Sequence, residues 1–423
     1  MTTRTPRIAF SLLGLILVIV LVAVASITHE GTQDARGLDA GGKPPIIRTV
    51  ALPTDGPASP QDDQTQIQTQ TQNTPVANEP SGLALAAEDA TASNGKPTYV
   101  GREVCRECHQ DNFDLHKKHG HASTFFLTSE TDLPEVFDGV TFDSGGDHGV
   151  YDYETDENRK LLAKLQGNNE VESLPLPFVL GSGHNAQTFL TLFTNANGET
   201  EGIEHRVTCY ADDRLDITVG HQDKKPTNSL EMYGDSIRGV TLTRCIHCHT
   251  TTATVQNGKI DDLISNVNCE KCHGPGSEHA RLARGNPNPP PYSVGLDTWD
   301  RESEIQLCGD CHRLPRSVTK QELREYPANL VRFQPIGMLR SKCSLESPGG
   351  LRCTTCHNPH ATNHGSSPQE HIQNCIQCHD QSVDTHVICP VSATDNCIEC
   401  HMPLVDQQQG IQFHDHWIRV HDE

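Results

Sequence analysis

The longest apolar stretch of the chain runs without a charge from Ile8 to Ile27 and follows two arginines. As a helix that rises about 1.5 Å per residue, it would be roughly 30 Å long, which is the thickness of a bilayer core. Because the basic residues precede it, its amino terminus should stay inside and the rest of the chain should be exported. Small residues at Ala23 and Ala25 also fit a cleaved secretory signal. We therefore expect residues 1–30 to be an N-terminal membrane anchor or a signal.

Polar residues dominate the next segment, residues 31–97. Its Gln, Thr, Pro, Gly and Ala offer too few large apolar side chains to build a core. We expect a disordered linker that holds the remaining domain, residues 98–423, away from the membrane.

Short β-branched and aromatic runs alternate with Gly, Asn and Asp turns between residues 135 and 222. GVTFD, GVYDY, PLPFVLGSG, TFLTLF, HRVTCYAD and LDITVG have the pattern of antiparallel strands. ENRKLLAKLQ interrupts them with a helical pattern. The region 135–222 is therefore predicted to be a small β-rich insertion.

The motif Cys-x-x-Cys-His occurs seven times. Its cysteines are Cys105 and Cys108, Cys245 and Cys248, Cys269 and Cys272, Cys308 and Cys311, Cys353 and Cys356, Cys375 and Cys378, and Cys397 and Cys400. Its histidines are His109, His249, His273, His312, His357, His379 and His401. Two thiols on one helical turn can bind the vinyl groups of a haem while the next imidazole reaches the iron. Structural zinc sites also use Cys-x-x-Cys, but they give no reason for a histidine after every second cysteine.

Seven covalently attached c-type haems change how the composition is interpreted. Only 5% of the 423 residues are aromatic, which is little for an ordinary core. Porphyrins are large apolar bodies, and a chain wrapped around them buries area that its own side chains do not supply. We expect a mainly α, haem-packed multihaem cytochrome with the small antiparallel β-rich insertion, which either covers the haem stack or shapes access to one haem.

The formal charge of −22 excludes nucleic acid as a partner, because the basic footprint that phosphates require is missing. On a redox protein an acidic surface steers a basic protein partner into a transient complex, although net charge also serves solubility alone.

Seventeen of the 24 histidines lie outside the motif-terminal positions. A neutral imidazole is the usual sixth ligand of a low-spin electron-transfer haem. We therefore expect at least five or six haems to have two histidine ligands.

Several sequence elements resemble one family of multihaem cytochromes. They are YVGREVCRECH followed by HKKHGHA, VNCEKCHGPGSEHA, LRCTTCHNPHA, CIECHMP followed by FHDHWI, and GSGHNAQTFL. Over about residues 98–421 the chain is similar to the family that includes the tetrahaem electron acceptor of hydroxylamine oxidoreductase, and most to its longer members. The resemblance implies that His279 and His360 bind neighbouring haems, and it points to His121 and His416 as further distal ligands. His221, His386, His184 and His364 are weaker candidates.

Three cysteines remain outside the motifs. In an exported protein Cys343 and Cys389 are the better candidates for a disulfide, since both fall within the compact haem region. Cys209 falls in an apparent strand and is expected to be a buried thiol.

Two functions fit these patterns. The first is an electron carrier at the periplasmic face of the cytoplasmic membrane, which passes electrons between quinol oxidation and a periplasmic partner. The second is an oxidoreductase that acts on hydroxylamine, nitrite or tetrathionate at one open haem, for which Cys105 to His109 is the first candidate. The missing Cys-x-x-Cys-Lys motif and the count of seven favour the carrier.

Overall fold

The computed structural model describes residues 96–167, 171–286, 288, 300–347, 349–363, 366–380 and 388–421. The expected anchor, and the expected linker up to residue 95, lie outside these residues. Within the described part of the chain, no helix is both long and apolar enough to cross a membrane.

The helices are short, and five of them end at a motif histidine: α5, α6, α8, α12 and α13. A Cys-x-x-Cys-His motif needs only one helical turn, so the helix stops once the turn is complete. Side-chain caps mark where some of these helices begin. Before α8, for example, the Asp300 carboxylate accepts a hydrogen bond from the backbone N–H of Ser303 at 2.8 Å. The helices are α2 Arg102–Arg106, α3 Gln110–His116, α4 Leu133–Phe137, α5 Gly239–His249, α6 Cys269–His273, α7 Ser277–Ala283, α8 Arg301–His312, α9 Lys320–Arg324, α10 Gln334–Met338, α11 Lys342–Glu346, α12 Pro368–His379 and α13 Cys397–His401.

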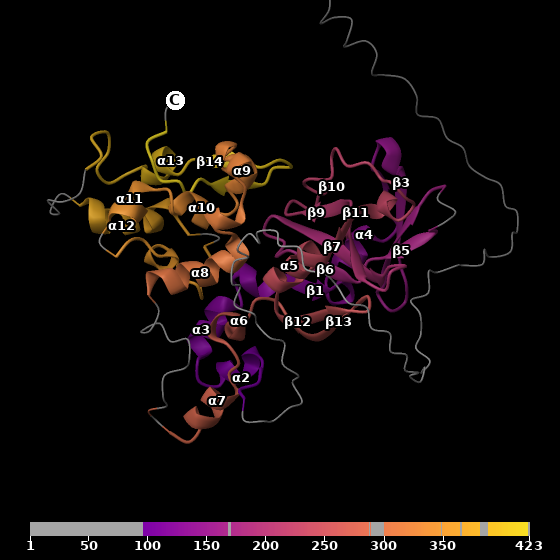
Figure 1. Ribbon diagram of the computed structural model, residues 1–423, viewed down its shortest axis with the longest axis horizontal. Helices are drawn as coiled ribbons and strands as arrows, with labels where there is room; N and C mark the ends of the chain where they lie inside the picture. Colours follow the sequence, from indigo (N-terminus) through magenta and orange to yellow (C-terminus); the bar gives the residue numbers. More distant parts are fainter. Residues whose placement is uncertain are drawn as a thin grey trace, which may run out of the picture. The chain divides into compact units, whose positions relative to one another are not determined.

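Within the described residues the strands form four sheets in which every paired neighbour is antiparallel. The largest has the order β1-β6-β7-β8-β11, with β9 also paired to β7 and β10 to β9; the others are β2-β3-β4-β5, β12-β13 and β14-β15. Figure 1 labels β1, β6, β7, β9, β10 and β11 of the largest sheet. The strands are β1 Phe125–Leu127, β2 Thr141–Asp143, β3 Val150–Thr155, β4 Leu161–Leu165, β5 Ser173–Pro175, β6 Phe178–Leu180, β7 Ala186–Thr194, β8 Thr200–His205, β9 Val207–Tyr210, β10 Leu215–Ile217, β11 Gly234–Arg238, β12 Thr250–Gln256, β13 Lys259–Ser265, β14 Leu404–Asp406 and β15 Gln412–His414.

The expected mainly α fold is wrong, because the described chain is a mixed α and β structure. Strands occur on both sides of residues 135–222, from β1 to β13, and the motif helices are brief. The helical pattern expected in ENRKLLAKLQ is also wrong. Its apolar residues form β4, in which Leu161, Leu162, Ala163 and Leu165 are all buried. A strand covered on both faces has a continuous apolar run, which periodicity alone does not separate from a buried helix.

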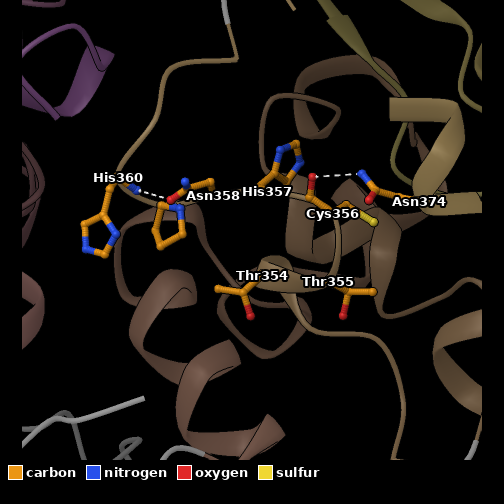
Figure 2. A pocket seen from close by; sticks show the side chains of 8 residues that line it. Thr354, Thr355, Cys356, His357, Asn358, His360 and Asn374 are labelled. Carbon is orange, nitrogen blue, oxygen red and sulfur yellow. Dashed lines mark hydrogen bonds between the residues drawn. The ribbon is translucent and has the colours of Figure 1, made fainter. Parts of the chain in front are cut away.

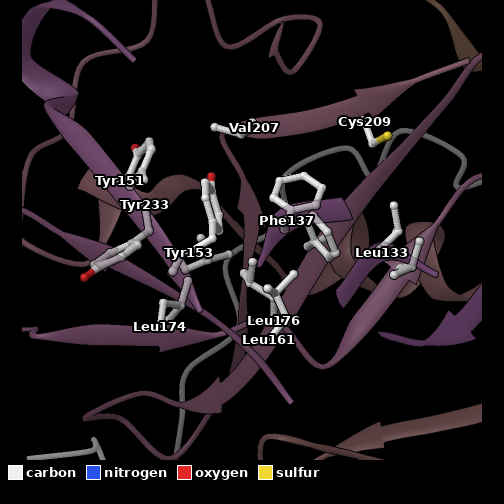
Figure 3. Packing of buried hydrophobic residues seen from close by; sticks show 14 of the residues in the cluster. Leu133, Phe137, Tyr151, Tyr153, Leu161, Leu174, Leu176, Val207, Cys209 and Tyr233 are labelled. Atoms are coloured by element: carbon white, nitrogen blue, oxygen red, sulfur yellow. The ribbon is translucent and has the colours of Figure 1, made fainter. Parts of the chain in front are cut away.

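The β-rich region has a conventional hydrophobic core. Phe137 is fully buried, and its ring meets that of Tyr153 edge to face at a centroid distance of 4.9 Å (Figure 3). Its ring also meets that of Phe189 edge to face, at 5.1 Å. Beyond residue 300 the largest buried apolar cluster contains only Ile305, Leu314 and Met338. The carboxy-terminal part described here therefore buries little apolar surface of its own.

Helix α5 connects the two kinds of structure. Its Leu242 and Ile246 are buried against Leu190 and Leu192 of β7, and Cys245 packs beside them. The motif that ends at His249 is thus held against the largest sheet.

A large-to-small change in the β-rich core should weaken that region selectively. We expect Phe137→Ala to lower its free energy of unfolding by about 3–5 kcal/mol, because a buried ring is replaced by a cavity. Hydrogen exchange should speed up in peptides from β3 and β7 and stay unchanged beyond residue 300. The control is Val240→Ala, which removes methyl groups from a side chain that is 75% exposed. Equal acceleration in both parts would show that the core is shared.

Candidate haem sites

Motif imidazoles are oriented by acceptors from other segments. His249 Nδ1 bonds Thr124 O at 2.9 Å, His312 Nδ1 bonds Gln334 Oε1 at 3.1 Å, and His401 Nδ1 bonds Arg419 O at 3.0 Å. A ring that donates from Nδ1 has its lone pair on Nε2. These three histidines therefore have the tautomer that binds a metal through Nε2.

Four motif imidazoles face a second imidazole from a distant part of the chain. The ring centroids are 6.2 Å apart for His109 and His279, 6.2 Å for His273 and His360, 6.1 Å for His312 and His121, and 6.2 Å for His357 and His416. The structure thus places each of the four distal residues implied by the resemblance opposite a motif histidine, and in every case the motif is not the one that it follows in sequence.

The spacing of these pairs fits an iron between the rings. Two imidazoles that bind one metal from opposite sides, each through a metal–nitrogen bond of about 2 Å, have centroids roughly 6 Å apart. Rings in direct contact come closer, as do those of His119 and His121 at 4.4 Å. The donor set and its spacing therefore fit the haem that the motifs imply.

Burial favours the neutral form of the imidazoles of His121, His312 and His416. It lowers the pKa of His121 to about 3 and that of His416 to about 4, and it lowers the pKa of His312 as well. Since only an unprotonated nitrogen binds a metal, these environments favour ligation at neutral pH.

His371 also faces a motif imidazole, although the sequence did not indicate it as a distal ligand. The ring of His371, on α12, lies 6.1 Å from that of His357, so His357 has two facing candidates, His371 and His416. The only signal for His371 was its place four residues before a motif cysteine. Its orientation depends on how α12 packs.

The weaker candidates differ in their surroundings. His221 is buried, and its Nε2 lies 3.3 Å from Glu204 Oε2 in the β-rich region. His184 is exposed, in the loop between β6 and β7. His364 and His386 lie outside the described residues.

Thiols of different motifs contact one another. The Cys269 thiol raises the pKa of Cys105, and the same contact lowers the pKa of Cys269 to about 7. Further contacts of this kind join Cys248 with Cys311, Cys308 with Cys353, and Cys375 with Cys397. A sulfur that has become a thioether no longer titrates, but the closeness of the motifs persists.

Side chains between the motif cysteines strengthen these contacts. His247 Nε2 lies 2.6 Å from Asp310 Oδ2, and Lys271 Nζ lies 3.2 Å from His247 Nδ1. The buried Glu270 accepts from the backbone N–H groups of Val100 and Gly101 at 2.9 and 2.8 Å, just before the first motif. Side chains at the variable positions of the motifs therefore hold separate parts of the chain together: His247 of the second motif contacts the third and fourth motifs, and Glu270 of the third contacts the segment before the first.

Cavities lie against motif imidazoles in the part of the chain that the structure describes. One, of about 470 Å³, is bordered by Cys356, His357 and His360, with Asn374 bonded to Cys356 O at 3.2 Å (Figure 2). Another, of about 380 Å³, lies against His249.

The structure tests what the sequence predicted for the three cysteines outside the motifs. The disulfide expected between Cys343 and Cys389 is absent, and both have unbridged thiols. They lie in different surroundings: Cys343 is near Cys378, and Cys389 interacts with the imidazole of His401. Cys209 is a buried thiol in β9, as expected.

Comparison with known proteins agrees with the motif chemistry. The profile of the family described as "Cytochrome c554 and c-prime" matches residues 217–274, and that of the "Doubled CXXCH motif" matches residues 348–384. The protein is a multihaem c-type cytochrome. The two matches cover limited parts of the cytochrome, so its specific family stays a prediction.

A search of curated proteins found no match. Among solved structures, "Crystal Structure of Outer Cell Wall Cytochrome OcwA" is similar with a TM-score of 0.45 and 15% identity, covering 76% of this chain and 79% of that one.

The contact between His247 and Asp310 should make the stability of the protein depend on pH. The hydrogen bond from His247 lowers the pKa of Asp310, so the contact stabilises the protein above pH 3.8 and is lost as the pH falls below that value. We expect Asp310→Asn to lower stability at pH 7 by less than about 1 kcal/mol, since the carboxylate is half exposed. Thermal unfolding at pH 7 and pH 3 measures the difference, which should shrink at the lower pH. Asp147→Asn, at an exposed position, serves as control; a pH-independent loss in Asp310→Asn would contradict the assignment.

Proposed function

We propose that this cytochrome carries seven haems, one at each motif, and relays electrons along them. The motif contacts support this proposal most directly. Each thioether sulfur is bonded to the edge of its porphyrin, so two sulfurs in contact bring two porphyrin edges together. Electrons can then pass between haems that are attached to distant parts of the chain.

Contacts and electrostatic interactions between motif thiols support an order of the haems, which are named here by the position of their motif in the sequence. The first is joined to the third through Cys105 and Cys269, and the fourth to the fifth through Cys308 and Cys353. Cys272 of the third interacts with Cys311 of the fourth. The fifth interacts with the sixth through Cys356 and Cys378, and the sixth with the seventh through Cys375 and Cys397. The proposed relay thus runs first, third, fourth, fifth, sixth, seventh.

The distal geometry favours a relay over catalysis at the first motif. The ring of His279 faces that of His109 at a centroid distance of 6.2 Å with an angle of 19° between the rings, so the two imidazoles would hold an iron between them. A haem held in this way at Cys105 to His109 would have no open site for a substrate.

We further propose that the amino-terminal apolar segment holds the relay at the periplasmic face of the cytoplasmic membrane. Quinol oxidation in the membrane would supply electrons, and a basic periplasmic protein would accept them. The run Ile8–Ile27 and the net charge of −22 support these assignments.

The first test of the proposal is haem stoichiometry. We expect the intact mass of the exported protein, after acid-acetone extraction, to equal that of the polypeptide plus seven haems, because thioether bonds survive that treatment. Peptide mapping should find one haem on each motif. A mass with fewer haems, or with bound zinc instead, would contradict the proposal.

Ligation is tested by removing the facing histidines. His279→Ala and His360→Ala should each leave seven haems attached but open one iron, since each variant lacks the ring opposite His109 or His273. Ferric electron paramagnetic resonance should gain one high-spin signal, and the reduced protein should gain one carbon monoxide site. His221→Ala is the matched control, because its ring is bonded within the β-rich region. Unchanged spectra in both test variants would sink these two assignments.

A further inference from the structure

Aromatic rings hold the guanidinium of Arg340 in place near the carboxy terminus. Its Cζ lies 3.6 Å from the centroid of the Trp417 ring and 5.0 Å from that of Tyr326. The guanidinium of Arg419 also lies on Trp417, with Cζ at 4.0 Å from the same centroid. Cation–π contacts of this kind fix the position of a guanidinium, but a ring face is no substitute for an oxygen that accepts from its N–H groups.

One nitrogen of Arg340 lacks such an acceptor. Its Nη1 is buried and forms no hydrogen bond with the residues that the structure describes. Asp415, the buried carboxylate of this cluster, is already engaged: Oδ2 accepts from Arg419 Nη1 at 2.9 Å, and Oδ1 accepts from Trp417 N at 2.8 Å. Two guanidiniums thus accompany one carboxylate, which leaves an excess positive charge. Because a buried charged donor without a partner is costly, an anion is expected at Arg340 Nη1.

The cluster is attached to one of the facing histidines. His416 directly precedes Trp417, and its ring faces that of His357 in the fifth motif at 6.2 Å. Ser341, the residue after Arg340, donates from Oγ to His416 O at 3.1 Å. The guanidinium of Arg340 is therefore held beside the segment that carries His416.

Buried guanidinium nitrogens without a hydrogen-bond partner recur beside other motifs. Arg102 precedes the first motif, and Arg313 directly follows His312 of the fourth; Nε is buried and unpartnered in both. Each also lies over an aromatic ring, Arg102 over Phe113 at 4.4 Å and Arg313 over Phe333 at 5.0 Å. A feature that returns next to separate motifs points to an anionic group that each motif brings with it.

Haem supplies such a group. Its thioether bonds use the vinyl groups, so its propionates remain free carboxylates. A guanidinium is suited to bind them, because its planar N–H donors match the two oxygens of a carboxylate and its charge is permanent. A haem whose iron lies between His357 and His416 would adjoin the cluster around Arg340.

We propose that Arg340 binds a propionate of the fifth haem, with Trp417 as the platform that holds its guanidinium. The inference rests on the part of the proposed function that places a haem at Cys353 to His357. Reduction adds an electron to the haem, and a nearby positive charge stabilises the added negative charge. Arg340 therefore keeps the reduction potential of the fifth haem, within the relay, above the value that an unpaired propionate would give it.

The first experiment is a crystal structure of the full exported protein with its haems attached. Peptide mapping must first find haem on Cys353 and Cys356, since a bare peptide would overturn the proposed stoichiometry and not the role of Arg340. With haem present, we expect a propionate oxygen of the fifth haem within hydrogen-bond distance of Arg340 Nη1. A protein carboxylate or water alone at that nitrogen would overturn the proposal and leave the relay intact.

A matched pair of variants tests the effect on the potential. In a spectroscopic redox titration, Arg340→Gln should shift the potential of one haem to a lower value, with seven haems attached and the low-spin signals retained. Arg324→Gln removes the same charge from an exposed position on α9, where solvent screens it, and should leave every potential unchanged. Equal titration curves for Arg340→Gln and the unsubstituted protein, or equal shifts in the two variants, would contradict the proposal.

The conservative variant separates the charge of Arg340 from its packing. Arg340→Lys keeps the positive charge but loses the planar group that lies on Trp417, so its potential should lie closer to that of the unsubstituted protein than that of Arg340→Gln does. If both variants lower the potential equally, the charge of Arg340 does not set it, and the proposal fails.

Discussion

A recurring feature of the described structure is a pair of facing imidazoles whose ring centroids lie about 6 Å apart. His109 and His279 come from segments far apart in sequence, as do His312 and His121. The spacing leaves room for an iron between the rings, and each such bridge would act as a cross-link between distant segments. Such cross-links would let the region beyond residue 300 keep a defined fold around a small apolar cluster.

The β-rich region is stabilised by its own apolar core, and that core also supports the motif at the end of α5. Its aromatic core is conventional, and it holds α5 through Leu242 and Ile246. The Thr124 carbonyl, shared by His249 and Gly181, extends that support to the proximal imidazole. The other motifs hold each other, through sulfur contacts and through side chains such as Glu270.

Some of this could be predicted from the sequence, since the motif cysteines and histidines carry their chemistry in their spacing. The six strand patterns between residues 135 and 222 also occur as strands, because alternation is a local property. Strand β4 is buried on both faces, so its sequence lacks the alternation that would have identified it as a strand. Strands β11 to β13 lie outside residues 135–222 and were not predicted, which contributed to the wrong fold class. The roles of His371 and Lys271 depend on which surfaces meet in the folded chain, so no local pattern reveals them. The same holds for Cys343 and Cys389, whose thiols are unbridged and have different partners although they share a region of sequence.

The account depends on where the irons lie, and anomalous scattering at the iron edge from crystals of the haem-loaded protein measures this directly. We expect one iron peak between the rings of each of four pairs: His109 and His279, His273 and His360, His312 and His121, and His357 with either His416 or His371. We also expect a peak at Nε2 of His249. Iron peaks away from these pairs, or a third and fourth iron that are not neighbours, would contradict both the ligation and the order of the relay.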